Sequence, residues 1–285
     1  MAVTNKSMRC RGRVLEFGRI PLFMGIVNVT PDSFSDGGLF FDPERAAGHA
    51  GRLLDEGAAI VDLGGESTRP GSQPVSPEEE IRRVVPVVEK IRRARPGCFI
   101  SVDTRHSATA RAVLEAGADI INDVSGLRDP AMAATVAEFD AGLVIMHMRG
   151  TPVDMQSPEN LIYDDVIREV CEFLGERVQS ALDNHVKRTN ILIDPGIGFS
   201  KNLEANRQLI GHIDRFRVLG LPLLAGPCRK KFIGQVLEID DPAERIFGTA
   251  GVAAWLAAQG VEVLRVHDVR QIREAVAMFM WCGGK

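Results

Sequence analysis

Cysteines and long apolar runs are scarce in this sequence, and each scarcity excludes a class of protein. Five of the 285 residues are cysteines, and no two of them form a CxxC pair. Such a chain is neither a disulfide scaffold nor a zinc ribbon, and it suits a reducing compartment. No stretch of about 18 apolar residues could span a bilayer, and the first eight residues lack the apolar core of a secretory signal. The sequence therefore predicts a cytoplasmic protein without a membrane partner.

An excess of positive charge is absent as well. The net charge is −4, with 25% charged and 45% apolar residues, values typical of a globular protein rather than of a disordered one. Acidic and basic residues are interspersed, so no nucleic-acid partner is expected. The basic run over residues 9–13 is short and interrupted by Gly12, which indicates a solvated surface strand.

Short apolar runs alternate with longer amphipathic segments along the chain. The runs are rich in Val, Ile and Leu, as in strands buried on both faces of a parallel sheet. The expected strands are 22–27, 59–63, 99–102, 119–121, 143–146, 191–193, 222–225 and 261–266. The expected helices are 43–56, 76–95, 107–116, 131–139, 163–185, 202–213, 242–259 and 269–280.

Eight strand–helix pairs without a dividing linker predict a single α/β domain over 1–285, a (β/α)₈ TIM barrel. Residues 9–17 are expected to form a short hairpin that closes one end of the barrel. Residues 1–8 are expected to be a flexible N-terminal extension.

Polar side chains follow every expected strand. They are Asn28, Asp62 and Glu66, Asp103, Asn122 and Asp123, His147, Asp194, Arg229 and Lys230, and Arg265 and His267. One such acid is often only a helix cap. However, the carboxyl ends of barrel strands converge on the face that holds the active site. Polar residues after all eight strands therefore predict an enzyme.

The acids and amides among these residues suit a flat heterocycle. Asp103 and Asp194 offer carboxylate oxygens, and Asn122 lies between them in strand order. Such groups can pair with several N–H donors along one ring edge.

Positive charge follows the last two strands. Lys230, Arg265 and His267 suit an anionic ligand or leaving group. The sequence has no GxxxxGK[ST] loop, and no GxGxxG follows a strand, which argues against a P-loop nucleotidase and a dinucleotide cofactor. His147 lacks metal-ligand spacing and is expected to be packed or hydrogen-bonded.

Two long polar loops, 28–38 and 64–71, follow the first two strands. Long βα loops of this kind are typically lids or binding loops. Asn28 opens the first loop, near acids and hydroxyls. It is a candidate ligand for Mg²⁺, an ion that takes few protein ligands and is shared with phosphates.

Eight motifs spread over residues 24–269 together resemble the dihydropteroate synthases. The motifs are MGIVNVTPDSFSDGG, GGESTRPGS, SVDT, INDVSG, MHMRG, DPGIGFSK, RKKFIG and RVHDV, in that order. The resemblance implies a cytoplasmic homodimeric barrel of folate biosynthesis. Such an enzyme joins 6-hydroxymethyl-7,8-dihydropterin diphosphate to p-aminobenzoate, giving 7,8-dihydropteroate and diphosphate.

The resemblance also implies a role for each matched residue. The pterin would be held by Asp103, Asn122, Asp194 and Lys230, with Met146 packed nearby. The diphosphate would be bound by Arg265 and His267, and Asn28 would bind Mg²⁺ together with it. Phe199 would line the aminobenzoate pocket, while Thr68, Arg69 and Pro70 would belong to the second loop and Asp36 to the first. Asp36, Thr68, Arg69 and Lys230 are the expected catalytic set, and Thr68 and Pro70 are also expected to contact substrate.

Two positions depart from the family pattern. Cys228 stands where the family usually has serine, and an inert, packed cysteine is expected there rather than a reactive thiol. Lys231 stands where a serine often contacts the aminobenzoate carboxylate. The lysine could pair with that carboxylate or turn outward, which leaves sulfonamide sensitivity open.

The implied mechanism is substitution at the pterin methylene with loss of diphosphate, and it needs no nucleophilic side chain. Loop closure after the pterin has bound would build the aminobenzoate site, so ordered binding is expected. Three alternatives remain: a methyltetrahydrofolate-dependent methyltransferase, a non-catalytic pterin-binding paralogue, and a Schiff-base aldolase. The last would need Lys230 buried with a depressed pKa.

Overall fold

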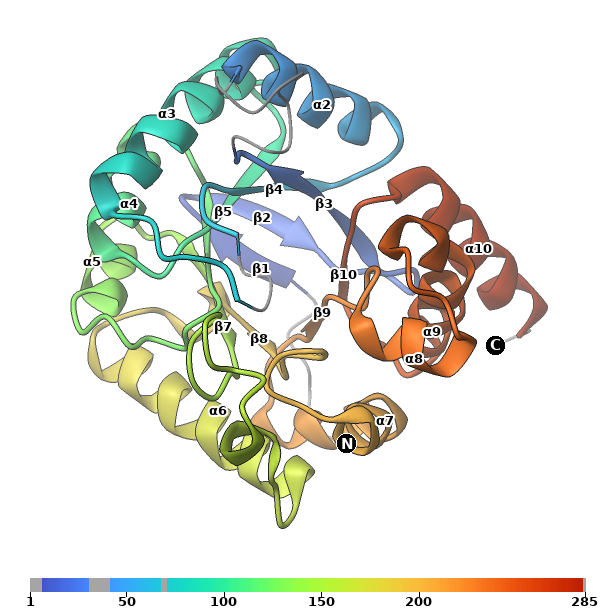
Figure 1. Ribbon diagram of the computed structural model, residues 1–285. Helices are drawn as coiled ribbons and strands as arrows, with labels where there is room; N and C mark the ends of the chain where they lie inside the picture. The colour runs from blue at the N-terminus through green and yellow to red at the C-terminus, as the bar shows by residue number, and fades with distance from the viewer. Residues whose placement is uncertain (1–6, 31–41, 68–70, 284–285) are drawn as a thin grey trace.

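The structure is a computed structural model that describes residues 7–30, 42–67 and 71–283. Its centre is a sheet of parallel strands (Figure 1), in the order β8-β7-β6-β5-β4-β3-β10-β9. The strands are β3 (Leu22–Asn28), β4 (Ile60–Gly64), β5 (Phe99–Asp103), β6 (Ile120–Asp123), β7 (Gly142–Met146), β8 (Ile191–Asp194), β9 (Leu224–Ala225) and β10 (Val263–Val266).

The two outer strands of this order also meet. Ile193 of β8 forms a parallel bridge with Leu223, and its N–H donates to the carbonyl of Pro222 at 3.1 Å. The sheet therefore closes into a barrel, which confirms the predicted fold.

Helices surround the barrel on its outer face (Figure 1). They are α2 (Pro43–Asp55), α3 (Pro77–Ala94), α4 (Ser107–Glu115), α5 (Met132–Glu138), α6 (Val166–Asp183), α7 (Leu203–Gly211), α8 (Lys231–Leu237), α9 (Ile246–Ala258) and α10 (Val269–Cys282). Side chains cap the first two of these helices: Asp42 accepts from the N–H of Glu44 at 2.8 Å, and Ser76 from that of Glu79 at 3.3 Å. Within the described ranges, no helix has the length and apolarity needed to cross a membrane.

Several predicted helix boundaries were wrong. The expected helix over 163–185 corresponds to α6, which spans only Val166–Asp183 and is capped by Asp165; a 3₁₀ helix, Pro158–Leu161, precedes it. The segment over 242–259 likewise divides into Pro242–Arg245 and α9. Helix α8 was not predicted, because its seven residues are too few to show a helical period.

An antiparallel hairpin, β1 (Ser7–Cys10) and β2 (Arg13–Glu16), closes the end of the barrel at which the strands begin. Met8 and Cys10 are fully buried there and pack with Leu15 against the lower layer of barrel side chains. That layer consists of Met24, Ile60, Ile120, Val144, Leu192, Leu224 and Val263. The expected flexible extension was therefore wrong for Ser7 and Met8, since Met8 contributes a buried apolar side chain; residues 1–6 lie outside the described chain.

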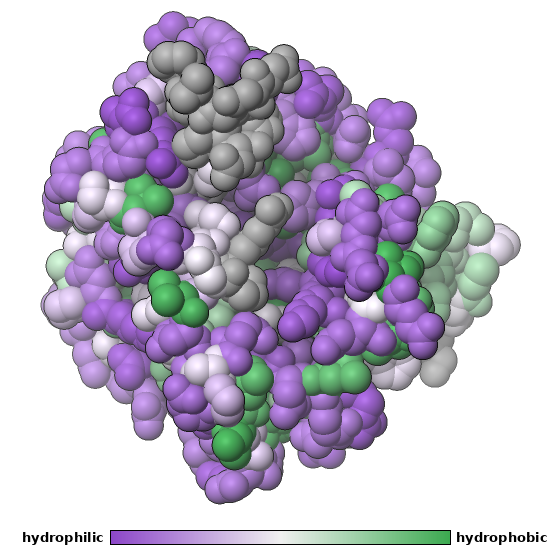
Figure 2. Space-filling view, viewed as in Figure 1, coloured by the Kyte–Doolittle hydropathy of each residue, from purple (hydrophilic) through white to green (hydrophobic). Residues whose placement is uncertain are grey.

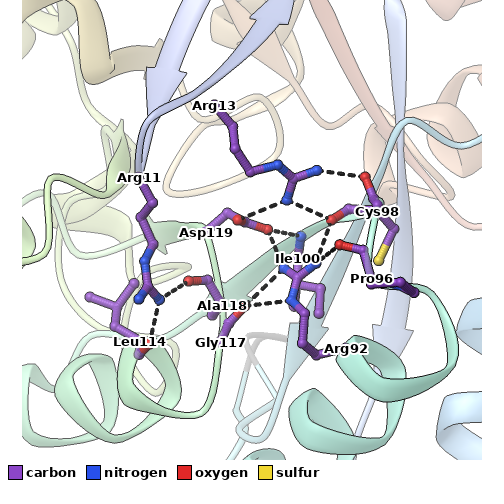
Figure 3. Close-up of polar contacts among 11 residues, drawn as sticks. Arg11, Arg13, Arg92, Pro96, Cys98, Ile100, Leu114, Gly117, Ala118 and Asp119 are labelled. Carbon is purple, nitrogen blue, oxygen red and sulfur yellow. Dashed lines mark hydrogen bonds and ion pairs between the residues drawn. The ribbon is translucent and has the colours of Figure 1, made fainter.

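The basic run in this hairpin holds it to the barrel (Figure 3). Arg13 donates to Asp119 Oδ1 at 3.0 Å and to the carbonyl of Cys98 at 2.9 Å. Arg11 donates to the carbonyl of Ala118 at 2.8 Å. The expectation of a solvated strand was therefore incomplete: the strand is present, but two of its arginines satisfy carbonyls and a buried carboxylate at the base of the barrel.

On four of these strands, the side chain two residues further along is polar. Successive residues of a strand face opposite sides, so every second residue faces the barrel interior. The residues two beyond Ile60, Ile120, Val144, Leu192 and Val263 are Asp62, Asn122, Met146, Asp194 and Arg265. The barrel interior therefore changes from an apolar lower layer to a largely polar layer at the carboxyl ends of the strands.

Candidate active site

Arg265 of β10 reaches past the neighbouring strand β3 to two carboxylates on β4 and β5. Its Nε donates to Asp62 Oδ2 at 2.6 Å, and its Nη2 donates to Asp103 Oδ2 at 2.9 Å. Asn122 Nδ2 also donates to Asp62 Oδ2, at 3.2 Å. Asp62, Asp103 and Asn122 are all buried. Asp62 Oδ1 is buried without a hydrogen-bond partner among the described residues, which is rare for a buried carboxylate oxygen.

This cluster has two carboxylates for one guanidinium. Burial raises the pKa of Asp103 to about 8 against the opposing effect of Arg265, and Asp62 adds to the rise. Burial acts to lower the pKa of Arg265, but the two carboxylates hold it above its ordinary value. The surplus carboxylate can be compensated by a ligand that brings hydrogen-bond donors.

Asp194 at the end of β8 is a third buried carboxylate. Its Oδ1 accepts from the N–H of Gly196 at 2.7 Å. Burial raises the pKa of Asp194 to about 6, opposed by that hydrogen bond and by Lys230. Asp62, Asp103, Asn122 and Asp194 thus bring several acceptors to one end of the barrel.

Lys230 follows β9 and lies over the ring of Phe199, with Nζ 3.6 Å from the ring centroid. Burial lowers the pKa of Lys230 to about 8, and the charge of Arg265 adds to this. Gly198 has φ +81°, and a Cβ there would lie 2.7 Å from Lys230 Cδ, so only glycine permits this approach. Burial and a neighbouring cation thus give Lys230 the depressed pKa that a Schiff-base lysine requires.

An apolar cluster forms one wall beside these groups. Val124, Met146, Met148, Met155 and Phe199 pack together apart from the main core. Their position at the carboxyl ends of β6, β7 and β8 gives the polar interior a flat-faced apolar neighbour suited to a ring.

His147 and Lys201 form a buried pair under the loop that follows β8. Lys201 Nζ lies 2.9 Å from His147 Nδ1 and donates to the carbonyl of Phe199 at 2.9 Å. The edge of the His147 ring packs against Phe173, with centroids 4.9 Å apart. Burial lowers the pKa of His147 to about 2 and also lowers that of Lys201. The prediction that His147 is hydrogen-bonded and packed is confirmed.

His267 lies between two other predicted residues at the rim. Its Nε2 is 3.4 Å from Asn28 Nδ2, and its Nδ1 is 3.2 Å from Cys228 Sγ. Cys228 is buried, as expected for a packed cysteine, and burial raises its pKa to about 11.

Other polar residues at strand ends have local structural roles. Glu66 accepts from Arg105 Nε at 2.9 Å, Arg229 pairs with Asp268, and Asp123 accepts from the N–H groups of its own following turn. Lys231 is exposed at the first position of α8. Asp36, Thr68, Arg69 and Pro70 lie outside the described residues.

Two residues of the site were not assigned from the sequence. Asp62 was noted only as a strand-end acid, and its bond with Arg265 depends on a contact between residues 203 apart in the chain. Lys201 lies in a loop, where no periodicity identifies it. Its one sequence signal was its place at the end of the DPGIGFSK motif.

The magnesium hypothesis can be tested against this rim. Among the residues that the structure describes, no group of three or more His, Cys, Asp and Glu could hold a metal. Asn28 offers a single hard oxygen beside His267, and Mg²⁺ commonly combines one or two protein ligands with phosphate oxygens and water. The residues therefore fit an ion that is brought largely by a phosphorylated ligand.

Fold and site together define a class of protein: a barrel enzyme with buried acceptors for a donor-rich ring and cations for an anionic group. The face in Figure 2 is hollowed near its centre, where hydrophilic residues gather. Residues 24–267 match the model of the pterin binding enzyme family.

Known proteins narrow this class further. The chain is 45% identical to a dihydropteroate synthase of Streptococcus pyogenes over 90% of this chain and 93% of the relative. Its fold matches a Xanthomonas albilineans dihydropteroate synthase with 4-aminobenzoic acid (TM-score 0.90, 41% identity, 99% and 100% of the two chains). A structure of the X. albilineans enzyme with 7,8-dihydropteroate matches with TM-score 0.86 and 39% identity, over 98% and 99% of the two chains. The chain belongs to the dihydropteroate synthases, transferases of folate biosynthesis.

Proposed function

We propose that this chain condenses 6-hydroxymethyl-7,8-dihydropterin diphosphate with p-aminobenzoate, releasing diphosphate and forming 7,8-dihydropteroate. The observation that carries the proposal is the surplus of buried acceptors around Asp62, Asp103 and Asp194 below a rim of cations. A pterin with a diphosphate tail presents N–H donors at one end and negative charge at the other. The structure has complementary groups at the two corresponding places.

The acidic layer binds the pterin ring. Asp103 and Asp194 accept from ring N–H donors, and Asn122 can both donate and accept. Met146 packs against the ring from the apolar wall. Because burial excludes water from these carboxylates, each hydrogen bond to them is stronger than at the surface.

The cationic rim binds the diphosphate. Arg265 has a third side to its guanidinium beyond the two contacts with Asp62 and Asp103, and His267 lies beside Asn28. Asn28 would hold Mg²⁺ through its amide oxygen. When bound, Mg²⁺ neutralises part of the charge that develops on the leaving diphosphate.

Aminobenzoate binds next to Phe199 and Lys230. The ring can pack on Phe199 and the apolar wall, while Lys230 supplies charge near both the pterin and the carboxylate. Lys231 is exposed close by and is a second candidate partner for the carboxylate. The loop residues Asp36, Thr68, Arg69 and Pro70 would complete this part of the site after the pterin has bound.

The reaction then needs positioning and charge stabilisation rather than a nucleophilic side chain. The bond between the pterin methylene carbon and the diphosphate oxygen breaks, and its electron pair leaves with the diphosphate. The amine nitrogen of aminobenzoate bonds to that carbon and afterwards loses a proton. Asp103 and Asp194 hold the ring and stabilise positive charge on it, while Lys230 and Arg265 stabilise the leaving group.

A second copy of the chain is proposed to bind at α9 and α10. These helices expose large apolar side chains, and hydrophobic residues are visible over α10 at the right of Figure 2. The exposed residues are Phe247, Trp255, Met278, Phe279 and Trp281, of which Phe247 is 86% and Trp281 77% exposed. Such a concentration is typical of a protein–protein interface. Sedimentation of the wild type and of Phe247→Asp tests for a homodimer of single-domain subunits.

Diphosphate release from the dihydropterin diphosphate, measured with Mg²⁺ and with or without p-aminobenzoate, tests the proposed reaction. Mass spectrometry identifies the product. Release that depends on aminobenzoate, with dihydropteroate formed, is the expected result. Tight pterin binding without product would instead indicate a non-catalytic paralogue. Borohydride trapping of a carbonyl substrate on Lys230 would indicate an aldolase.

A further inference from the structure

The residue before Lys230 has an unusual backbone conformation. Arg229 has φ +55°, in the left-handed region that residues other than glycine rarely adopt. It lies between β9 and α8, and Lys230 follows it as the N-cap of α8, with φ −64° and ψ 153°. Rotation about the N–Cα bond of Arg229 moves the whole of Lys230 relative to β9. The conformation of Arg229 therefore decides where the ammonium group of Lys230 lies.

Three groups hold Arg229 in this conformation. Its backbone N–H donates to Thr249 Oγ1 at 3.1 Å, and its carbonyl accepts from Arg245 Nη1 at 3.1 Å. Its guanidinium donates to the two carboxylate oxygens of Asp268, at 2.7 Å and 3.1 Å. A non-glycine residue stays in a rarely populated backbone region only where its surroundings hold it there. These contacts come from the 3₁₀ helix over 242–245, from α9 and from the residue that precedes α10.

Arg245 serves the whole segment and not Arg229 alone. It is almost fully buried, and it also donates to the carbonyls of Ile239 and Asp240, which follow α8. A Cβ at Gly234 would lie 2.6 Å from Arg245 Nε, so glycine lets α8 pack against this guanidinium. Loss of Arg245 would disturb α8 as a unit.

Thr249 makes a more selective contact. It is fully buried on α9, and its hydroxyl donates to the carbonyl of Arg245, one turn earlier, at 2.9 Å. A hydroxyl has one proton, so towards the N–H of Arg229 the same oxygen is the acceptor. One side-chain atom thus connects Arg229 to the helix that carries Arg245.

The side of the barrel that receives Lys230 fits it closely. Lys230 Nζ lies 3.6 Å from the centroid of the Phe199 ring. Gly198 lacks the Cβ that would lie 2.7 Å from Lys230 Cδ. Because the stem of Lys230 packs directly on this backbone, a small rotation at Arg229 would separate the ammonium group from the ring.

We propose that Thr249 is a positioning residue for Lys230: its hydroxyl holds the left-handed backbone of Arg229 and thereby keeps the ammonium group over Phe199. What Lys230 does at that place rests on the proposed function, in which its charge lies near both substrates. Thr249 itself touches neither substrate, since it acts through the backbone of Arg229.

A matched set of substitutions isolates this hydroxyl. Thr249→Val keeps the shape of the side chain and removes the acceptor, whereas Thr249→Ser keeps the acceptor. Thr135→Val is the control, because Thr135 is also buried and donates to the carbonyl of Ala131, one turn earlier, at 2.9 Å. Thr135 belongs to α5, on the opposite side of the ring of helices from α8 (Figure 1).

The position of Lys230 is measured by NMR of the full-length protein with ¹³C-labelled lysine. Protons above the face of an aromatic ring are shifted upfield, so the Hε signal of Lys230 should lie upfield of other lysines; Lys230→Arg assigns it. Thr249→Val should move this signal toward the ordinary lysine position. Thr249→Ser and Thr135→Val should leave it in place. A wild-type signal without the upfield shift, or an unchanged signal in Thr249→Val, would overturn the proposal.

Affinity for the dihydropterin diphosphate gives a second readout. Calorimetric titration with Mg²⁺ should show binding that is weaker in Thr249→Val by about threefold to tenfold, the effect of a weakened hydrogen bond or charge contact. Thr249→Ser should bind within about twofold of the wild type, and Thr135→Val should bind equally well. An equal loss in Thr249→Ser and Thr249→Val, or in Thr135→Val, would also overturn the role of the hydroxyl.

These measurements separate two kinds of failure. An inactive wild type whose upfield lysine signal depends on Thr249 would disprove the proposed reaction and leave the positioning role intact. An active wild type in which Thr249→Val changes neither readout would do the reverse. Thermal unfolding of each variant controls for the fold. If Thr249→Val does not fold, Thr249→Ala replaces it, with the same expected changes.

Discussion

The two ends of the barrel each bury carboxylates beside arginine, but they balance the charge differently. At the lower end, where the strands begin, Asp119 pairs with both Arg13 and Arg92, and it also accepts from the N–H of Ile100. At the upper end, which is formed by the carboxyl ends of the strands, Asp62 and Asp103 share Arg265, and Asp62 Oδ1 has no hydrogen-bond partner among the described residues. The lower cluster is complete within the protein, whereas the upper one has unused acceptors. Unsatisfied charge, rather than buried charge as such, distinguishes the binding site from the structural cluster.

Removing the carboxylate of the lower cluster should have the largest effect on stability. In Asp119→Ala, Arg13 and Arg92 lose a buried partner, and the free energy of unfolding should fall by about 3–5 kcal/mol. The hairpin would also lose an attachment to the barrel. Urea denaturation measures the change, and kcat at a temperature where the variant is folded should stay near the wild-type value. A large loss of kcat in folded Asp119→Ala would contradict the division between the two ends.

The matching change at the upper end should affect ligand binding instead. Asp103→Asn replaces an acceptor for the pterin with an uncharged group, and pterin affinity should fall by about tenfold to 100-fold, as for a hydrogen bond to a charged group. Stability near pH 8 should change little, because the upper end already has more carboxylates than cations. Calorimetric titration with the pterin and urea denaturation test both parts. A loss of stability as large as that of Asp119→Ala would show that Asp103 is structural.

The buried histidine at the upper end predicts a pH dependence of stability. The pKa of His147 is lowered to about 2 by burial, so the unfolded chain binds a proton there more readily than the folded one. Stability from this group is present above about pH 6.5 and is lost as the pH falls from there toward 2, by at most about 1.4 kcal/mol per pH unit. His147→Gln should show a shallower decline between pH 6.5 and 5. Equal slopes in urea denaturation for the two proteins would contradict this assignment.

Ligand binding should release protons from the upper cluster. Burial raises the pKa of Asp103 to about 8, so this group is largely protonated at pH 7 in the free protein. N–H donors of a pterin favour the ionised form, so binding should release up to about one proton per site. Calorimetry in buffers of different ionisation enthalpy measures this number. Asp103→Asn is the control and should release fewer protons.

The sequence predicted the fold well, because the alternation of apolar runs and amphipathic segments reports the barrel directly. It also predicted that Asp103, Asn122 and Asp194 lie together at the carboxyl end of the barrel, since a side chain at the end of a parallel strand must lie there. It could not identify the partners of Arg265, because the pairing of β10 with β3 brings Arg265 close to Asp62 of β4 and Asp103 of β5, which lie far from it in the sequence. Short helix α8 and the early start of β1 were missed because each has too few residues to show a period.

The closure of the barrel has a consequence for where the wall can open. The joint between β8 and β9 rests on the bridge of Ile193 with Leu223, and β9 itself has two residues. Neighbouring pairs such as β3 with β4 are joined over five residues. The strand ends beside this seam lead to Asp194 on one side and to Cys228 and Lys230 on the other. The backbone amides at the joint between β8 and β9 should therefore exchange with solvent sooner than those of the longer strand pairs. This joint is the part of the barrel wall beside the substrates that should open most readily.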